Sequence, residues 1–230
     1  MTAAAGLDSG LAAQADALHR RVEAGDELLG WKVGLNAPAV QAALGLDGVV
    51  VGFLTTASEL PSGTAHSLAG ASNPGIEPEL AVRFGADVPA ESSPERVAAA
   101  IDALAPALEL VDLDLPLDDL HAILAGNVFH RGALLGGFDD GRAGGALDGL
   151  AVAVTRNDDE AGSVSVAESY RELVETLRVV TRRLAVMGET LRAGQFVIAG
   201  SLTPIVPVAP GDEVRADFGS LGALELSFTD

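Results

Sequence analysis

Residues 73–84, NPGIEPELAVRF, and residues 106–112, PALELVD, are strand-like apolar segments that carry three glutamates. In the first segment, strict alternation places Glu77 and Glu79 on one face of a strand and the apolar residues on the other. On a helix, the same spacing would separate the two carboxylates by about 200°. Pro78 between them is typical of a strand start or a sheet edge, and it argues against a helix interior. The segment therefore predicts a strand with two carboxylates on one face.

Glu109, in the second segment, is a third carboxylate in apolar surroundings. Burying an ion costs several kcal/mol unless a partner compensates it. Carboxylates that face one point are the ligands that hard cations such as Mg²⁺ or Mn²⁺ prefer. The alternative is a set of buried acids paired with arginines, for example Arg83 or Arg131. The spacing alone leaves both interpretations open.

The composition limits the classes of function. The 230 residues include 33 Asp and Glu against 14 Lys and Arg, and the formal net charge of −19 argues against nucleic-acid binding. The chain has no cysteine, which excludes disulfides, thiolate nucleophiles and cysteine-ligated metals. No apolar run approaches the roughly 18 residues that span a bilayer, and the first ten residues do not resemble a signal peptide. We expect a cytoplasmic protein without a membrane partner.

Helical and strand-like patterns are interspersed without a regular βαβ rhythm. The periodicities predict helices over 8–29, 38–44, 94–105 and 167–187. They predict strands at 31–35, 49–54, 76–84 and 106–112, and a further strand from about 133. A hairpin follows, with its first strand at 150–156 and its turn at 157–160, and three or four strands close the chain. This order predicts an α+β fold with a curved, mixed and largely antiparallel sheet. We place an N-terminal helical segment at 1–29 and the catalytic domain at 30–230.

Six ordered segments resemble the 2-keto-4-pentenoate hydratase and 4-oxalocrotonate decarboxylase branch of the fumarylacetoacetate hydrolase superfamily. They are GWKVGL (30–35), GIEPELAVRF (75–84), PALELVD (106–112), VTRNDDE (154–160), LAVMGETLRAGQFVIAGSLTP (184–204) and GDEVRADFGSLGALELSF (211–228). The resemblance implies a rolled mixed β-sheet with flanking helices. It also implies a divalent metal, Mg²⁺ or Mn²⁺, held by the glutamates that match Glu77, Glu79 and Glu109.

The same resemblance implies a chemistry. A small 2-oxo acid chelates the metal through its carboxylate and keto oxygens, and the metal stabilises a dienolate. Water then adds to a 2-hydroxydienoate, a reaction of aromatic-compound catabolism. Lys32 matches the active-site lysine, which either holds the substrate carboxylate or shuttles a proton. We also expect a homo-oligomer.

Three further residues are candidates for substrate binding. Asn127 retains the asparagine of an Asp-Asn pair found in the family. Ser201 and Thr203 lie at a strand–turn junction, where hydroxyls either bind the substrate carboxylate or satisfy the turn backbone. His130 is either a structural histidine or a replacement acid–base group.

The chain departs from the family pattern at two places. Thr55 and Thr56 stand where relatives have an aspartate, and residues 163–174, SVSVAESYRELV, replace a Gly-His-Pro loop. Three alternatives to hydration therefore stay open. They are decarboxylation of a 2-oxo diacid such as an oxalocrotonate, C–C hydrolysis of an acylpyruvate, and binding of metal and dicarboxylate without turnover. Hydrolysis ranks lower because those relatives carry a histidine–glutamate pair in an N-terminal segment, and no histidine lies between GWKVGLNAPAV (30–40) and His66 here.

Overall fold

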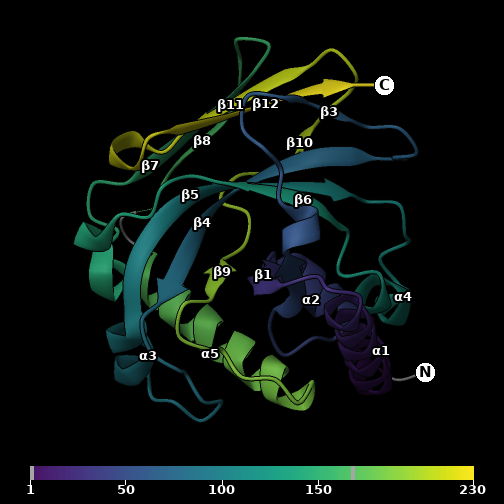
Figure 1. Ribbon diagram of the computed structural model, residues 1–230, viewed down its shortest axis with the longest axis vertical. Coiled ribbons are helices and arrows are strands. Elements are labelled where there is room, and N and C mark those ends of the chain that lie inside the picture. Colours follow the sequence, from purple (N-terminus) through teal and green to yellow (C-terminus); the bar gives the residue numbers. More distant parts are fainter. Residues whose placement is uncertain (1–2, 167–168) are drawn as a thin grey trace.

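The computed structural model describes residues 3–166 and 169–230, and these residues form two β-sheets with helices packed on the larger one (Figure 1). The larger sheet has the order β2-β1-β9-β4-β5-β6, with β10 also paired to β4. Its strands are β1 (Leu28–Gly34), β2 (Val50–Thr55), β4 (Pro74–Phe84), β5 (Ile101–Asp112), β6 (His130–Leu135), β9 (Phe196–Ile198) and β10 (Val206–Pro207).

The smaller sheet lies across the top of Figure 1 and has the order β3-β12-β11-β7-β8. Its strands are β3 (Ala65–Ser67), β7 (Ala151–Arg156), β8 (Asp159–Ser165), β11 (Glu213–Asp217) and β12 (Ala223–Thr229). The β1–β9 and β3–β12 pairs are parallel, whereas the other pairs among these strands are antiparallel. The predicted α+β class and the mixed, largely antiparallel pairing are confirmed, but the strands divide between two sheets.

The helices gather below the larger sheet in Figure 1. They are α1 (Ala3–Glu23), α2 (Pro38–Leu44), α3 (Pro94–Ala100), α4 (Leu120–Ala125) and α5 (Tyr170–Val186). Within the described residues, no helix is long and apolar enough to cross a bilayer. Leu11 and Leu18 of α1 belong to the same buried cluster as Trp31 of β1. The N-terminal segment therefore packs into the core of the main fold.

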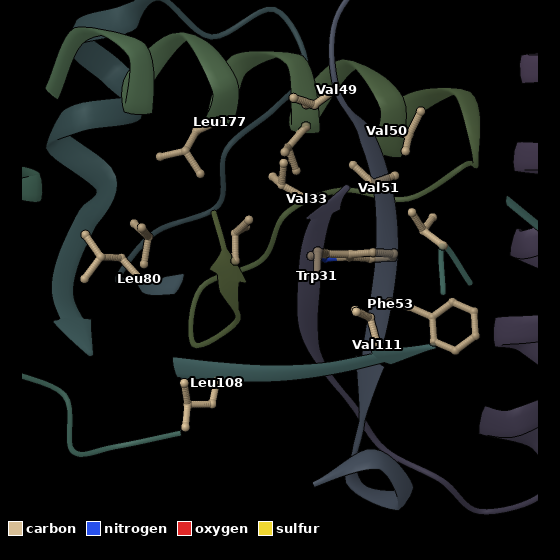
Figure 2. Close-up of a cluster of buried hydrophobic side chains, with 14 of the residues drawn as sticks. Trp31, Val33, Val49, Val50, Val51, Phe53, Leu80, Leu108, Val111 and Leu177 are labelled. Carbon is tan, nitrogen blue, oxygen red and sulfur yellow. The ribbon is translucent and has the colours of Figure 1, made fainter. Parts of the chain in front are cut away.

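One face of the larger sheet packs into this core. Figure 2 shows Trp31 and Val33 of β1 beside Val51 and Phe53 of β2, with α5 and its Leu177 against them. The opposite face carries Lys32, the three glutamates, and a small cluster that includes Ala81, Ala105, Ala107 and Ala133. Because side chains alternate along a strand, apolar residues on one face leave the charged residues together on the other.

Two predicted boundaries are wrong. The helix expected over 94–105 ends at Ala100, and β5 begins at Ile101. Residues 101–105 are alanine-rich and favour a helix locally, but they pair with β4 and are buried, and tertiary packing overrides such propensity. Pro106 also disfavours a helical residue before it. The helix expected over 8–29 ends at Glu23, and Leu28 already belongs to β1.

Candidate metal centre

The strand register brings the three glutamates together. Glu77 on β4 lies directly opposite Glu109 on β5, and Glu79 follows on the same face of β4. Side chains directly opposite each other have Cβ atoms about 4.5–5.5 Å apart, and like charges in such a pair destabilise the sheet. One carboxylate oxygen from each residue lies within 4.8 Å of the other two. The cluster therefore requires protons or a cation.

Burial makes that requirement stronger. Glu79 and Glu109 have no exposed surface, and Glu77 is half-buried. Burial, together with the neighbouring Glu109, raises the pKa of Glu77 to about 7 against the opposing effect of Lys32. Burial and then the Glu109 and Glu77 carboxylates raise the pKa of Glu79 well above its usual value. Without a cation, the two carboxyls on β4 therefore take up protons at a higher pH than ordinary glutamates do.

Glu109 has the opposite balance. Its Oε1 atom lies 3.0 Å from Lys32 Nζ and 2.7 Å from His130 Nδ1, and all three side chains are buried. Burial acts to raise the pKa of Glu109, but Lys32 and His130 together outweigh it and lower that pKa. Glu109 therefore stays ionised at the centre of the cluster.

Each fully buried carboxylate is held at one oxygen only. Glu79 Oε2 accepts a hydrogen bond of 2.6 Å from the backbone N–H of Gly200, and Glu109 Oε1 has the two contacts above. Glu79 Oε1 and Glu109 Oε2 are buried without a hydrogen-bond partner among the described residues. Such buried oxygens require an explanation, and an oxygen-preferring divalent cation supplies one. By formal charge, the three carboxylates and Lys32 together carry two negative charges, which match one such ion. The residues present therefore fit Mg²⁺ or Mn²⁺.

The alternative arginine partners lie elsewhere. Arg83 pairs with Asp102 at 2.9 Å and with Asp140 at 3.1 Å. Arg131 pairs with Asp114 at 2.6 Å. Because both guanidinium groups face other carboxylates, the structure does not support an arginine-paired acid cluster.

The register also explains how Lys32 reaches the cluster. Lys32 pairs with Ile198 of β9, and Ile198 pairs with Ala81 of β4, two residues from Glu79. Gly52 lies opposite Lys32 on β2. A Cβ atom at Gly52 would lie 2.8 Å from Lys32 Cγ and 2.9 Å from a side-chain oxygen of Asn127. The glycine therefore leaves the space that the lysine side chain occupies.

His130 reaches the cluster because of an irregularity in β6. Leu110 pairs with Gly132, but Val111 pairs with His130, so Arg131 is an extra residue in the ladder. Such a bulge changes the face of the sheet on which a neighbouring side chain lies. In regular pairing Arg131 would have faced Val111, and the bulge instead places His130 on the face of Glu109. His130, for which the sequence left two roles open, therefore directly contacts a candidate metal ligand.

The three candidate substrate-binding residues lie in different environments. Asn127 accepts the Phe53 N–H at 2.8 Å and donates to the Phe53 carbonyl at 2.9 Å, so its amide joins the segment before β6 to β2. Ser201 and Thr203 line a cavity of about 510 Å³ together with Lys32 and Glu77. Their hydroxyls donate to the carbonyls of Thr203 and Pro204 at 2.7 and 3.1 Å, so both help to satisfy the turn backbone.

The two departures from the family pattern include buried residues, namely Thr55, Val166, Leu173 and Val174, as well as exposed ones. Thr56, in the short 3₁₀ turn Thr56–Ser58, donates a hydrogen bond of 2.6 Å to Asp26. Ser163 and Ser165 lie on β8 with exposed side chains, and residues 167–168 of the altered segment lie outside the described residues. Sequence reasoning missed Gly200, whose N–H holds Glu79. The only signal was a glycine two residues beyond the end of a buried strand.

Comparisons with known proteins identify a family and several relatives. Residues 46–229 match the family described as "Fumarylacetoacetate (FAA) hydrolase C-terminal". A 4-oxalocrotonate decarboxylase from Pseudomonas sp is 28% identical over 216 residues, which are 91% of this chain and 82% of the relative. A 2-hydroxyhexa-2,4-dienoate hydratase from Comamonas testosteroni is 28% identical over 220 residues, 93% of this chain and 83% of the relative.

A solved structure is also similar. The 4-oxalocrotonate decarboxylase from Pseudomonas putida G7, complexed with magnesium and adipate, superposes with a TM-score of 0.83 at 26% identity, covering 94% of this chain and 83% of that one. The family predicted from the six ordered segments is confirmed. The chain belongs to the fumarylacetoacetate hydrolase family.

Proposed function

We propose that this protein is a divalent-metal-dependent lyase that hydrates a 2-hydroxydienoate, a 2-keto-4-pentenoate-like acid. The observation that carries the proposal is the convergence of Glu77, Glu79 and Glu109 beside a cavity that Lys32 also lines. Relatives that are 25–28% identical over most of their length carry hydratase names for such acids. The magnesium complex of the similar decarboxylase supports a divalent metal here.

The protein's own residues have distinct roles in this proposal. Glu77, Glu79 and Glu109 would hold the ion, and Gly200 and His130 fix the orientation of two of these carboxylates. When bound, the ion would supply Lewis-acid chemistry toward the keto oxygen of a chelated 2-oxo acid. Lys32 Nζ is close to Glu109 and lines the cavity, so it can hold the substrate carboxylate or carry a proton. Ser201 and Thr203 offer hydroxyl oxygens to the same space.

Decarboxylation of a 2-oxo diacid is the second candidate. It is supported by the decarboxylase names of relatives at 26–28% identity, and it uses the same ligand set. Binding without turnover is a third outcome, since Thr56 faces Asp26 instead of supplying an acid to the cavity. Location in the cytoplasm and assembly into a homo-oligomer stay predictions.

One assay separates these candidates. The protein is incubated with Mg²⁺ and, in turn, with 2-hydroxypenta-2,4-dienoate, an oxalocrotonate and an acylpyruvate, while the substrate absorbance is followed. Glu109→Gln and an EDTA-treated sample serve as controls. Loss of the dienoate only with Mg²⁺ and intact Glu109 supports hydration. Metal-independent turnover, or turnover by Glu109→Gln at the wild-type rate, contradicts the proposal.

A further inference from the structure

The N-terminal helix α1 carries a polar side chain on its buried face. Leu11, Ala15 and Leu18 are buried there, and Gln14 lies among them with no exposed surface. Of the α1 side chains that the structure describes, Gln14 is the only polar one that is buried. Its Oε1 atom has no hydrogen-bond partner among the described residues. Because a buried oxygen without a partner lowers stability, the contribution of α1 to stability does not account for a glutamine at this position.

The Gln14 amide makes one hydrogen bond, and its partner is the side chain of Asn127. Gln14 Nε2 donates to Asn127 Oδ1 at 3.3 Å. The same Oδ1 atom accepts the N–H of Phe53 at 2.8 Å, while Asn127 Nδ2 donates to the Phe53 carbonyl at 2.9 Å. A carbonyl oxygen has two lone pairs, so both acceptor positions of Asn127 Oδ1 are occupied. Asn127 is not among the residues that line the cavity beside Lys32, and its contacts are those of a residue that holds other groups in place.

The Asn127 amide lies beside the side chain of Lys32. A Cβ atom at Gly52 would lie 2.8 Å from Lys32 Cγ, 3.0 Å from Lys32 Cε and 2.9 Å from Asn127 Oδ1. The amide oxygen and the lysine side chain are therefore neighbours over Gly52. A free lone pair on that oxygen would be a second acceptor for the Lys32 ammonium group, which contacts Glu109 Oε1 at 3.0 Å. The hydrogen bond from Gln14 occupies this lone pair and leaves the ammonium group to Glu109.

We propose that Gln14 is a positioning residue that acts through Asn127 to keep Lys32 Nζ directed at Glu109 and the cavity. The backbone around Asn127 explains why this support from α1 is needed. Asn127, Val128 and Phe129 have φ values of +61°, +55° and +65°, a left-handed conformation that is uncommon for residues with a Cβ atom. Such strain persists only where the surrounding structure enforces it. The catalytic consequence rests on the proposed function, whereas the position of Lys32 can be measured without a substrate.

The sequence offers a direct probe of that position. Lys32 is the only lysine of the chain, so protein grown with ¹³C-labelled lysine gives a single ¹³Cε signal in the NMR spectrum. Gln14→Met keeps the length of the side chain and removes the amide, and Gln14→Leu is a second variant of the same kind. We expect either variant to move the Lys32 signal or to split it in two. Leu18→Ala removes apolar packing from the same face of α1 but keeps the amide, and it should leave the signal in place.

Kinetics and thermal unfolding of the same variants separate positioning from a structural role. With Mg²⁺ and 2-hydroxypenta-2,4-dienoate, kcat of Gln14→Met should fall about two- to tenfold, the equivalent of one hydrogen bond between neutral groups, and KM should change less. Its Tm should equal or exceed that of the wild type, because a buried oxygen without a partner is removed. Leu18→Ala should show the opposite behaviour, with a lower Tm from lost packing and an unchanged kcat. A merely structural glutamine would lose Tm and kcat together.

The outcomes separate this inference from the proposed function. A Lys32 signal that is unchanged in both Gln14 variants overturns the inference, whatever the activity of the wild type. The same displacement in Leu18→Ala also overturns it, because the packing of α1 and not the amide would then place the lysine. A displaced signal with an unchanged kcat overturns the catalytic consequence. A displaced signal in a protein whose wild type turns over no dienoate supports the placement of Lys32 by Gln14 and contradicts the proposed function alone.

Discussion

Replacing Glu77 with glutamine separates the electrostatics of the glutamate cluster from its ability to bind metal. In the metal-free protein the pKa of Glu77 is raised from 4.5 to about 7. The folded chain therefore binds this proton more tightly than the unfolded chain does. The resulting stability is fully present below pH 4.5 and is lost as the pH rises to about 7.

The size of that loss follows from the two pKa values. A difference of about 2.5 pH units corresponds to about 3 kcal/mol at 1.36 kcal/mol per unit. Because Glu77 is only half-buried, solvent screening makes this an upper value. Glutamine does not titrate, so between pH 4 and pH 8 the free energy of unfolding of Glu77→Gln should fall by up to about 3 kcal/mol less than that of the wild type. Groups outside the cluster largely cancel in that difference, whereas Glu79 does not, because the Glu77 carboxylate helps to raise the pKa of Glu79.

Urea unfolding in EDTA measures this difference, with the fluorescence of Trp31, the only tryptophan and fully buried, as the signal. Adding Mg²⁺ at 100 times its Kd should stabilise the wild type by about 2.7 kcal/mol. The same concentration should stabilise Glu77→Gln less, because a ligand is lost. Glu91→Gln, at an exposed position outside the cluster, is the matched control. Equal pH dependence in Glu77→Gln and the wild type, or equal stabilisation by Mg²⁺, would refute the reasoning.

Two further substitutions test the neighbours of the cluster. His130→Phe removes the contact of 2.7 Å to Glu109. Calorimetry should show Mn²⁺ binding weakened about 10- to 100-fold, because His130 orients a metal ligand. An unchanged Kd would show that Glu109 needs no such support. Gly52→Ala places a Cβ atom 2.8 Å from Lys32 Cγ and should cost about 1–3 kcal/mol of stability as well as lowering kcat. Gly137→Ala is the control, because a Cβ atom there meets nothing within 4 Å, and it should change neither stability nor kcat. If the two alanine variants behave alike, the Cβ atom at residue 52 does not displace the Lys32 side chain.

Parts of the fold were predictable because the local signals agree with the tertiary structure. The helix predicted at 38–44 is α2, which begins at Pro38 and ends before Gly45 with φ +65°. The hairpin predicted near 157 has Asn157 and Asp158 at positive φ, the backbone that a tight two-residue turn requires. In β4, alternation around Pro78 directly indicated which side chains share a face. These signals depend on residues within a few positions of one another.

Other parts depend on distant pairing and were not predictable. Residues 101–105 become strand only because β4 pairs with them. The contact of His130 with Glu109 depends on one extra residue in β6, Arg131, which changes the face that His130 occupies. The left-handed conformation of Val128 contradicts its local preference. The position of each carboxylate on its strand was thus readable from the sequence, whereas the supporting contacts required the register of neighbouring strands.

A crystal soaked with Mn²⁺ tests the central claim most directly, through the anomalous signal of the ion. We expect one strong peak that lies about 2.0–2.3 Å from an oxygen of each of Glu77, Glu79 and Glu109, with Glu109 contributing the Oε2 atom that now lacks a partner. A well-occupied peak elsewhere, or one that contacts the two β4 glutamates while Glu109 stays apart from it, would contradict the three-carboxylate site.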